Sequence, residues 1–234
     1  MPAEIRARIQ EIIQRNHNVK SFRLEISGVL DFKAGQFLLV KFQNNPQLKR
    51  YLSVSSSPTE KGYLEFTKKL TESDFSKTLD NLSVGDEVII QYPFGKFVLD
   101  ESIRKIAFLS GGIGITPIRS ICKYVVDKNL GIDIILVYAN RSVKDIVFKD
   151  DFDAMMKSYS ALRITHVLCE TEPGFQCTVG RINREIVKKE IPDYPERKFY
   201  LCGPPQMVEA MRLLLAQDLG LSTEEIITEN FQGY

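Results

Sequence analysis

The sequence predicts two domains: an antiparallel Greek-key β-barrel, followed by an α/β domain built on a doubly wound parallel sheet. The first hundred residues hold six short runs rich in β-branched and aromatic residues, separated by turn residues, as in a closed or sandwiched antiparallel sheet. From about residue 103, apolar runs alternate with helical stretches, which indicates a parallel sheet. The boundary is expected at 100–104, which gives domains 1–101 and 102–234 of the 234 residues.

The expected elements follow from these runs in order. Barrel strands are predicted at residues 5–13, 21–26, 36–42, 51–55, 63–69 and 87–92. In the second half, strands are predicted at 106–109, 133–138, 163–168, 199–202 and 226–230, and helices at 117–127, 147–157, 180–189 and 205–217. Ligands of such sheets bind at the carboxyl ends of the strands, so a site is expected at that edge.

A glycine-rich loop follows the strand at 106–109. Its glycines allow a tight turn and a close approach of a ligand to the backbone. Thr116 suits an N-cap and Pro117 the first helical position. Strand, bare loop and helix N-terminus together predict an anion site for a diphosphate, although a turn without a ligand fits the same pattern. The loop glycines are Gly111, Gly112 and Gly114.

Composition excludes several classes of function. The formal net charge of +1 gives no reason to expect a nucleic-acid partner, and no apolar run suggests a membrane span or a signal peptide. Four cysteines without a C-x-x-C pair suit free thiols in the cytoplasm. With two histidines and no iron–sulfur spacing, no metal site is expected, so redox chemistry would need an organic cofactor or an outside partner.

Two segments of the barrel half carry candidate binding residues. Arg50, in a predicted strand, can pair with a diphosphate, and Ser53 can donate a hydrogen bond to a flavin ring; an ordinary strand with a solvated arginine is the alternative. Further on, Asp74 or Ser76 could cap a short helix whose N–H groups would bind phosphate. A surface helix with a cap would look the same.

Two segments of the second half are also candidates. Cys202 ends a predicted strand, where its thiol could lie against a nicotinamide ring or simply be buried in the core. Gly203 and Pro204 form the turn after it. The chain ends on aromatic residues, of which Tyr234 could cover a flavin face or dock on the core.

Taken in this order, the motifs resemble the ferredoxin–NADP reductase superfamily over essentially the whole chain. The resemblance implies a six-stranded flavin-binding barrel and a five-stranded parallel nicotinamide domain, with FAD and NADH or NADPH as cofactors. It implies catalytic roles for Ser53, Cys202 and Glu229. The implied cofactor-binding residues are Arg50, Tyr51, Leu52, Ser53, Thr67, Lys68, Ser76, Gly111, Gly112, Gly114, Thr116, Pro117, Arg141, Cys202, Gly203, Pro204, Phe231 and Tyr234.

The chain departs from the family pattern at three places. Leu52 replaces the usual tyrosine, so aliphatic packing would take the place of a ring stacked on the flavin. Tyr92 replaces the glycine before Pro93. Three residues extend past Phe231, so either Phe231 or Tyr234 could cover the flavin.

The choice between NADH and NADPH depends on one phosphate group. Glu170 stands where NADP-binding relatives often carry arginine, and its charge would disfavour a 2′-phosphate by about 1 to 4 kcal/mol. Arg141 and Ser142 could offset that repulsion. We therefore expect NADH.

The function implied is hydride transfer from a reduced nicotinamide to bound FAD, with electrons passed to a separate ferredoxin, flavodoxin, oxygenase component or small molecule. One alternative is a flavin reductase that uses flavin as a diffusible substrate. Another is an electron-transfer subunit of a larger complex. Lysines of the barrel half could steer an acidic partner or be ordinary solvated residues.

Overall fold

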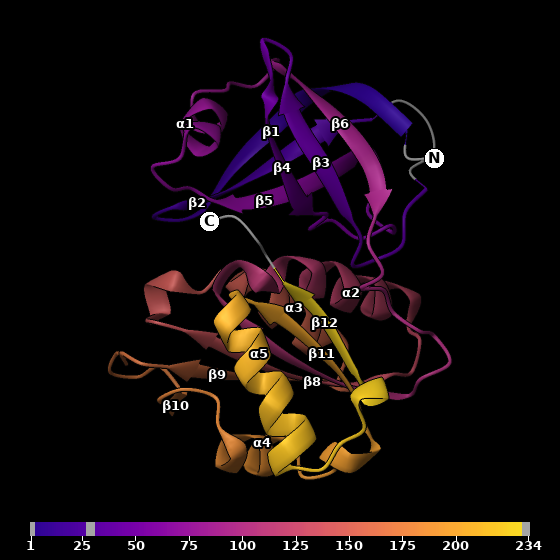
Figure 1. Ribbon diagram of the computed structural model, residues 1–234, viewed down its shortest axis with the longest axis vertical. Helices are drawn as coiled ribbons and strands as arrows, with labels where there is room; N and C mark the ends of the chain where they lie inside the picture. The colour runs from indigo at the N-terminus through magenta and orange to yellow at the C-terminus, as the bar shows by residue number, and fades with distance from the viewer. Residues whose placement is uncertain (1–2, 27–30, 231–234) are drawn as a thin grey trace. The chain divides into compact units, whose positions relative to one another are not determined.

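The computed structural model describes residues 3–26 and 31–230, and its backbone divides into two compact units (Figure 1). Among the described residues, the first unit holds 3–26, 31–99 and 116–127, and the second holds 100–115 and 128–230. The predicted boundary between residues 101 and 102 stays a prediction. Among the described helices, none has the length and hydropathy that a bilayer span requires.

The first unit holds an antiparallel sheet of six described strands, in the order β4-β3-β6-β1-β2-β5. An isolated antiparallel bridge between Val54 and Phe66 joins the two ends of that order, so the sheet closes into a Greek-key barrel. The strands are β1 (Ala3–Asn16), β2 (Val19–Glu25), β3 (Phe37–Phe42), β4 (Asn45–Ser53), β5 (Tyr63–Lys69) and β6 (Glu87–Phe94), with helix α1 (Asp74–Asp80) between β5 and β6.

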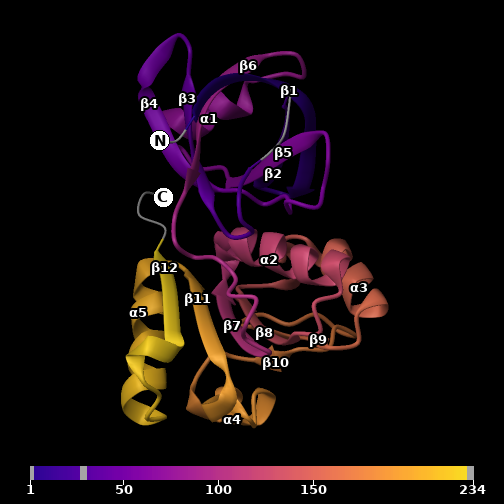
Figure 2. The same cartoon turned by 90° about the vertical axis from the view of Figure 1, so that its right-hand side faces the viewer.

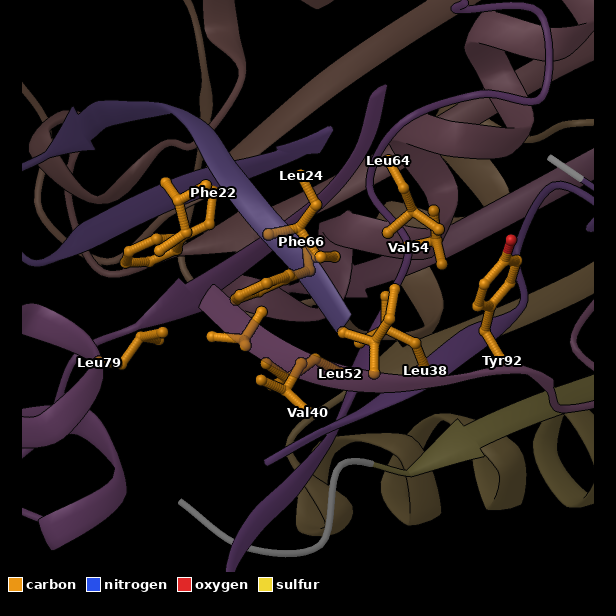
Figure 3. Close-up of a cluster of buried hydrophobic side chains, with 14 of the residues drawn as sticks. Phe22, Leu24, Leu38, Val40, Leu52, Val54, Leu64, Phe66, Leu79 and Tyr92 are labelled. Carbon is orange, nitrogen blue, oxygen red and sulfur yellow. The ribbon is translucent and has the colours of Figure 1, made fainter. Parts of the chain in front are cut away.

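Alternation of side chains along these strands fills the barrel with apolar groups. The rings of Phe22 and Phe66 stack with centroids 5.2 Å apart. Leu38, Leu64 and Leu52 pack in the same cluster (Figure 3). Leu52 is only 8% exposed, so the residue expected to replace a stacked tyrosine lies in the barrel core.

Two local expectations for this unit were wrong. Strand β4 begins at Asn45 rather than at residue 51, because Asn45 already pairs with Phe42 across a tight turn. Pro46 fits there because β4 lies at one end of the sheet order, where a missing N–H costs little. The cap of α1 is Ser73, whose hydroxyl accepts from the N–H of Ser76 at 3.3 Å, rather than Asp74 or Ser76.

The second unit holds a parallel sheet of six described strands in the order β10-β9-β8-β7-β11-β12, which confirms the predicted fold class. Helices α3 and α4 lie on opposite faces of it (Figure 2). The strands are β7 (Lys105–Gly111), β8 (Asp133–Asn140), β9 (Leu162–Leu168), β10 (Thr178–Val179), β11 (Lys198–Gly203) and β12 (Ile226–Asn230), and the helices are α3 (Lys149–Ser158), α4 (Arg184–Glu190) and α5 (Pro205–Leu213).

Here too some boundaries differ from expectation. The implied five-stranded sheet gains β10, a strand too short to show a periodic pattern. Helix α4 begins at Arg184 rather than at residue 180, because Asn183 caps it by accepting from the N–H of Ile186 at 2.9 Å. Helix α5 ends at Leu213 and continues to Asp218 as a π-helical turn.

Helix α2 (Ile115–Lys128) follows the glycine-rich loop. Because it begins at Ile115, Thr116 lies inside it and is not its cap, contrary to expectation. Most of α2 belongs to the first unit, where Arg119 forms a buried ion pair with Glu60 and donates to the Ser55 carbonyl at 3.1 Å. The Ser120 hydroxyl donates to the Ser56 carbonyl at 2.6 Å. These bonds fix α2 to the segment that follows β4.

Candidate functional site

Arg50 lies beside α1 on the barrel unit, and its charge acts on a second cation, Lys68. The guanidinium carbon of Arg50 lies 5.7 Å from the centroid of the Phe75 ring, which places the Arg50 side chain next to α1. Burial and then repulsion by Arg50 and Lys69 lower the pKa of Lys68 from 10.5 to about 8. An anion such as a diphosphate, bound beside Arg50 and Lys68, would relieve this repulsion.

Hydroxyl groups gather at the start of the same helix. The Ser76 hydroxyl lies 3.1 Å from that of Thr71 and 3.2 Å from that of Ser73. Arg50 reaches this helix at Phe75, the residue before Ser76. The structure therefore places Arg50 beside the first turn of α1, which carries Ser76, and close enough to Lys68 for the two charges to repel each other.

Ser53, at the end of β4, has a buried hydroxyl that lacks a hydrogen-bond partner within the described residues. Leaving such a group unpaired costs about 1 to 3 kcal/mol. A ligand acceptor would satisfy it, so the residue fits the hydrogen bond to a flavin that the sequence predicts. Its neighbour Tyr51 is 59% exposed, and its ring meets that of Phe37 edge-on at 5.4 Å.

Thr67 lies in a buried polar network that sequence reasoning missed. Its hydroxyl lies 2.7 Å from that of Ser21 and 2.8 Å from that of Ser55. Ser55 donates to the fully buried carboxylate of Glu65, which also pairs with two arginines. Contact between Thr67 and a flavin stays a prediction; in the structure its side chain joins strands β2 and β5.

The three glycines of the glycine-rich loop differ in backbone conformation and in what a Cβ would contact. Gly112 has φ of +52°, a left-handed conformation that favours glycine, and open space where a Cβ would lie. At Gly114, a Cβ would meet the Cys202 carbonyl oxygen at 2.3 Å, so that residue must be glycine for packing. At Gly111, a Cβ would meet the sulfur of Met207. The space beside Gly112 is therefore open, and a ligand could approach the loop backbone there.

The turn after β11 lies directly against this loop. A Cβ on Gly203 would come within 3.2 Å of the backbone of Gly111. Cys202, just before it, is fully buried. The structure therefore brings together the two glycine turns that the sequence assigned to the nicotinamide cofactor, with Pro204 beside them as the residue before α5.

Glu229 of β12 is in register with Cys202 of β11. One of its carboxylate oxygens is buried without a hydrogen-bond partner in the described residues. Burial raises the pKa of Glu229 from 4.5 to about 8, and burial followed by the charge of Glu229 raises the pKa of Cys202 well above its ordinary value. At neutral pH, Glu229 is therefore mostly protonated and Cys202 is a thiol.

The raised pKa of Glu229 makes stability depend on pH. The folded chain holds this proton more tightly than the unfolded chain, so the contribution is fully present below pH 4.5 and is lost as pH rises through about 8. Glu229→Gln removes this dependence. We expect the wild-type melting temperature to fall relative to the variant between these pH values, as measured by circular dichroism. Parallel curves for the two proteins would contradict the assignment.

Arg141 and Glu170 lie at the carboxyl ends of neighbouring strands β8 and β9. The Arg141 Nε donates to Glu170 Oε1 at 2.8 Å, and both side chains are exposed. Ser142 is occupied locally, since its hydroxyl donates to Asp145 at 2.8 Å. Arg141 is thus paired with Glu170, and the Ser142 hydroxyl is bonded to Asp145 in the short helical turn that follows it.

Four further predicted residues lie at the start of α2 or at the end of the chain. Thr116 and Pro117 are buried in the first turn of α2. Phe231 and Tyr234 lie outside the described residues, so which of them covers a flavin stays a prediction.

Two family models match the chain in the order of its sheets. The oxidoreductase FAD-binding domain matches residues 6–99, and the oxidoreductase NAD-binding domain matches residues 108–213. The first is the barrel with the orphaned Ser53 hydroxyl and the Arg50–Lys68 pair; the second contains the glycine-rich loop and Cys202. The residues present therefore fit both cofactors.

Curated relatives and solved structures agree with these matches. The glycine betaine monooxygenase reductase subunit of Chromohalobacter salexigens is 30% identical, over 89% of this chain and 59% of the relative, so the chain spans less than two thirds of that protein. NADH-cytochrome b5 reductase 1 of Dictyostelium discoideum is 30% identical over 91% of this chain and 77% of its own length.

A ferredoxin NADP+ reductase from Neisseria gonorrhoeae, solved with bound FAD and NADP, superimposes with a TM-score of 0.85 at 21% identity, covering 98% of this chain and 99% of that one. At this identity the likeness shows the fold. The two domain matches and the relatives establish that the chain belongs to the family of oxidoreductases that combine an FAD-binding domain with an NAD-binding domain, and its fold is that of a ferredoxin NADP+ reductase.

Proposed function

We propose that this protein is an NADH-dependent flavoprotein reductase that delivers electrons to a separate acceptor. Residues 1–101 would bind FAD, and residues 102–234 would bind the nicotinamide dinucleotide. The observation that carries the proposal is the buried Ser53 hydroxyl without a partner in the described chain, on the domain that matches the FAD-binding model. A family member that had lost its flavin would have no reason to keep it.

The barrel residues would divide the work of holding FAD. Arg50, Lys68 and Ser76 would bind the diphosphate, because Arg50 lies beside α1, its charge acts on Lys68, and the Ser76 hydroxyl lies in the first turn of that helix. Ser53 would donate its hydrogen bond to the flavin ring. Bound FAD would supply the chemistry that links a two-electron donor to a one-electron acceptor. The protein would position the cofactor and set the electrostatic environment around it.

The α/β residues would hold the nicotinamide dinucleotide. Backbone N–H groups of the glycine-rich loop and of the start of α2 would bind its diphosphate. Cys202 and Glu229 would contribute an uncharged surface near neutral pH, since burial keeps both protonated. No general base is needed, because hydride transfer depends on alignment of the two rings.

Glu170 supports NADH over NADPH. Its carboxylate accepts a hydrogen bond from Arg141, one of the two residues predicted to favour a 2′-phosphate, and the other, Ser142, is bonded to Asp145. Glu170→Gln is expected to raise the ratio of kcat/KM for NADPH to that for NADH by about tenfold, because it removes a like charge and releases the arginine. Steady-state kinetics with both nucleotides measure the ratio. Glu172→Gln, two residues on, is the control; equal ratios in both variants would refute the role of Glu170.

The acceptor is proposed by class. Relatives are named as a monooxygenase reductase subunit and as a cytochrome b5 reductase. We therefore propose a separate redox protein as the acceptor, namely a ferredoxin, a flavodoxin or an oxygenase component, with a small molecule as the alternative. The four cysteines are free thiols, which supports a reducing compartment, and we propose the cytoplasm.

Flavin content and turnover test the proposal together. The purified chain is desalted, its flavin is extracted and quantified, and NADH oxidation is followed with a panel of acceptors. We expect one FAD per chain and turnover that depends on an acceptor. Flavin-loaded protein that oxidises neither NADH nor NADPH would contradict the proposed activity.

A flavin reductase is the second candidate, and the position of Leu52 favours it. Because the side chain is part of the barrel core, no ring at that position stacks on a flavin, and flavin binding would be weaker. A colourless protein after desalting, with NADH oxidation that saturates with added free flavin, would favour this candidate over the first.

A further inference from the structure

Tyr138 is a buried tyrosine at the carboxyl end of β8. The preceding residues on its face of the strand, Ile134 and Leu136, are fully buried aliphatic groups, and Tyr138 is equally buried. A phenylalanine would fill the same space. Burying a hydroxyl costs free energy unless the group is hydrogen-bonded. The hydrogen bonds of the Tyr138 hydroxyl must therefore explain why a tyrosine is present here.

Two hydrogen bonds of this hydroxyl go to loops at the carboxyl edge of the sheet. It donates to the Gly112 carbonyl at 2.9 Å and accepts from the N–H of Val147 at 3.4 Å. Gly112 belongs to the loop after β7, and Val147 lies just before α3. Burial raises the pKa of Tyr138, so the phenol keeps the proton that it donates.

The carbonyl of Gly112 is the group that sets the direction of the loop. The Gly112 residue is in the left-handed conformation, and its carbonyl also accepts from the N–H of Ile115. With two donors, the Tyr138 hydroxyl and the Ile115 N–H, the carbonyl of Gly112 is fixed in one orientation. The backbone of the loop that the proposed function assigns to the diphosphate is thereby held in one conformation.

We propose that the Tyr138 hydroxyl is a positioning group for the nicotinamide dinucleotide: by holding the Gly112 carbonyl, it fixes the loop in the conformation that binds the diphosphate. The inference rests on the proposed function, because that function assigns the loop to the dinucleotide. Tyr138 itself is fully buried, so it would act through the loop.

Tyr138→Phe tests the inference in the full FAD-containing chain. We expect the Kd for NAD+ and for ADP-ribose to rise about fivefold to tenfold, as for the loss of one hydrogen bond. The Kd for AMP, which lacks the diphosphate, should stay within about twofold, as should the limiting rate of flavin reduction. General damage to the fold would not separate ADP-ribose from AMP.

Tyr159→Phe is the matched control. The Tyr159 hydroxyl is buried in the same unit and donates to the Ile132 carbonyl at 2.9 Å, before β8 rather than at its carboxyl end. Its removal should leave all three Kd values unchanged. The same Kd for ADP-ribose in both variants would overturn the inference, as would equal losses for AMP and ADP-ribose. So would a Tyr138→Phe variant that does not fold, because the hydroxyl would then support the fold rather than the loop.

Failure of the proposed function would look different. In that case the wild-type chain would bind neither NAD+ nor ADP-ribose. A wild-type chain that binds both, beside a Tyr138→Phe variant that binds them equally well, would remove the inference and leave the function standing.

Discussion

Glu65→Gln is expected to lower the free energy of unfolding by about 3 kcal/mol, because it leaves two arginines facing a neutral group in a buried site. The Glu65 carboxylate is fully buried; its Oε2 accepts from Arg15 Nη2 and from Arg23 Nε, each at 3.0 Å. Its Oε1 accepts from Ser55 at 2.9 Å. Glutamine preserves the shape and removes the charge, so the loss reports electrostatics rather than packing.

Chemical unfolding followed by circular dichroism measures this loss. Glu87→Gln is the control, since Glu87 is an exposed residue of β6 and the same substitution there should cost less than about 0.5 kcal/mol. FAD content should be compared in folded samples of both variants. Equal stability of the two variants would show that the Glu65 network does not hold the barrel together.

Among substitutions that add one methyl group in the α/β unit, Gly114→Ala is expected to lower stability and NAD+ affinity the most. The added Cβ would lie 2.3 Å from the Cys202 carbonyl oxygen and 2.6 Å from the Gly203 Cα, and backbone cannot move aside as a side chain does. Overpacking of this kind costs about 1 to 3 kcal/mol or more. Because the loop must shift away from the turn after β11, NAD+ affinity should fall by more than about tenfold.

Gly111→Ala is the matched control in the same loop. Its Cβ would meet the sulfur of Met207, near the end of a flexible side chain that can rotate away. Its effect on stability and on NAD+ affinity should therefore be several times smaller. Calorimetric titration with NAD+ and thermal melting compare the two variants. A Gly111→Ala variant as impaired as Gly114→Ala would contradict the packing argument.

Local sequence signals predicted much of this architecture. Strands β5 and β12 have the predicted boundaries, Tyr63–Lys69 and Ile226–Asn230, because their runs of β-forming residues end at clear turn residues. The glycine-rich loop and the turn after Cys202 were also predicted from local sequence. Backbone conformation or close packing requires glycine at these positions, so the glycines are visible in the sequence.

Ion pairs and hydrogen bonds between residues far apart in the sequence could not be predicted in this way. Glu65 meets Arg15 across 50 residues of sequence, and Arg119 meets Glu60 across 59. Nothing in the spacing of these residues distinguishes them from solvated charges, and the Tyr138 hydroxyl looks like any core tyrosine until its partner, the Gly112 carbonyl, is seen. The helix caps were missed differently: Ser73, Asp74 and Ser76 all suit a cap, and only the backbone shows that Ser73 has the extended conformation required.

The central claim is that one chain passes electrons from NADH to FAD that it binds, and an anaerobic titration tests it most directly. Protein loaded with FAD is freed of unbound flavin and titrated with NADH while the flavin absorbance is followed. We expect one equivalent of NADH to bleach one equivalent of bound flavin, and an added acceptor to restore the colour. A chain that retains FAD whose spectrum neither NADH nor NADPH changes would contradict the account.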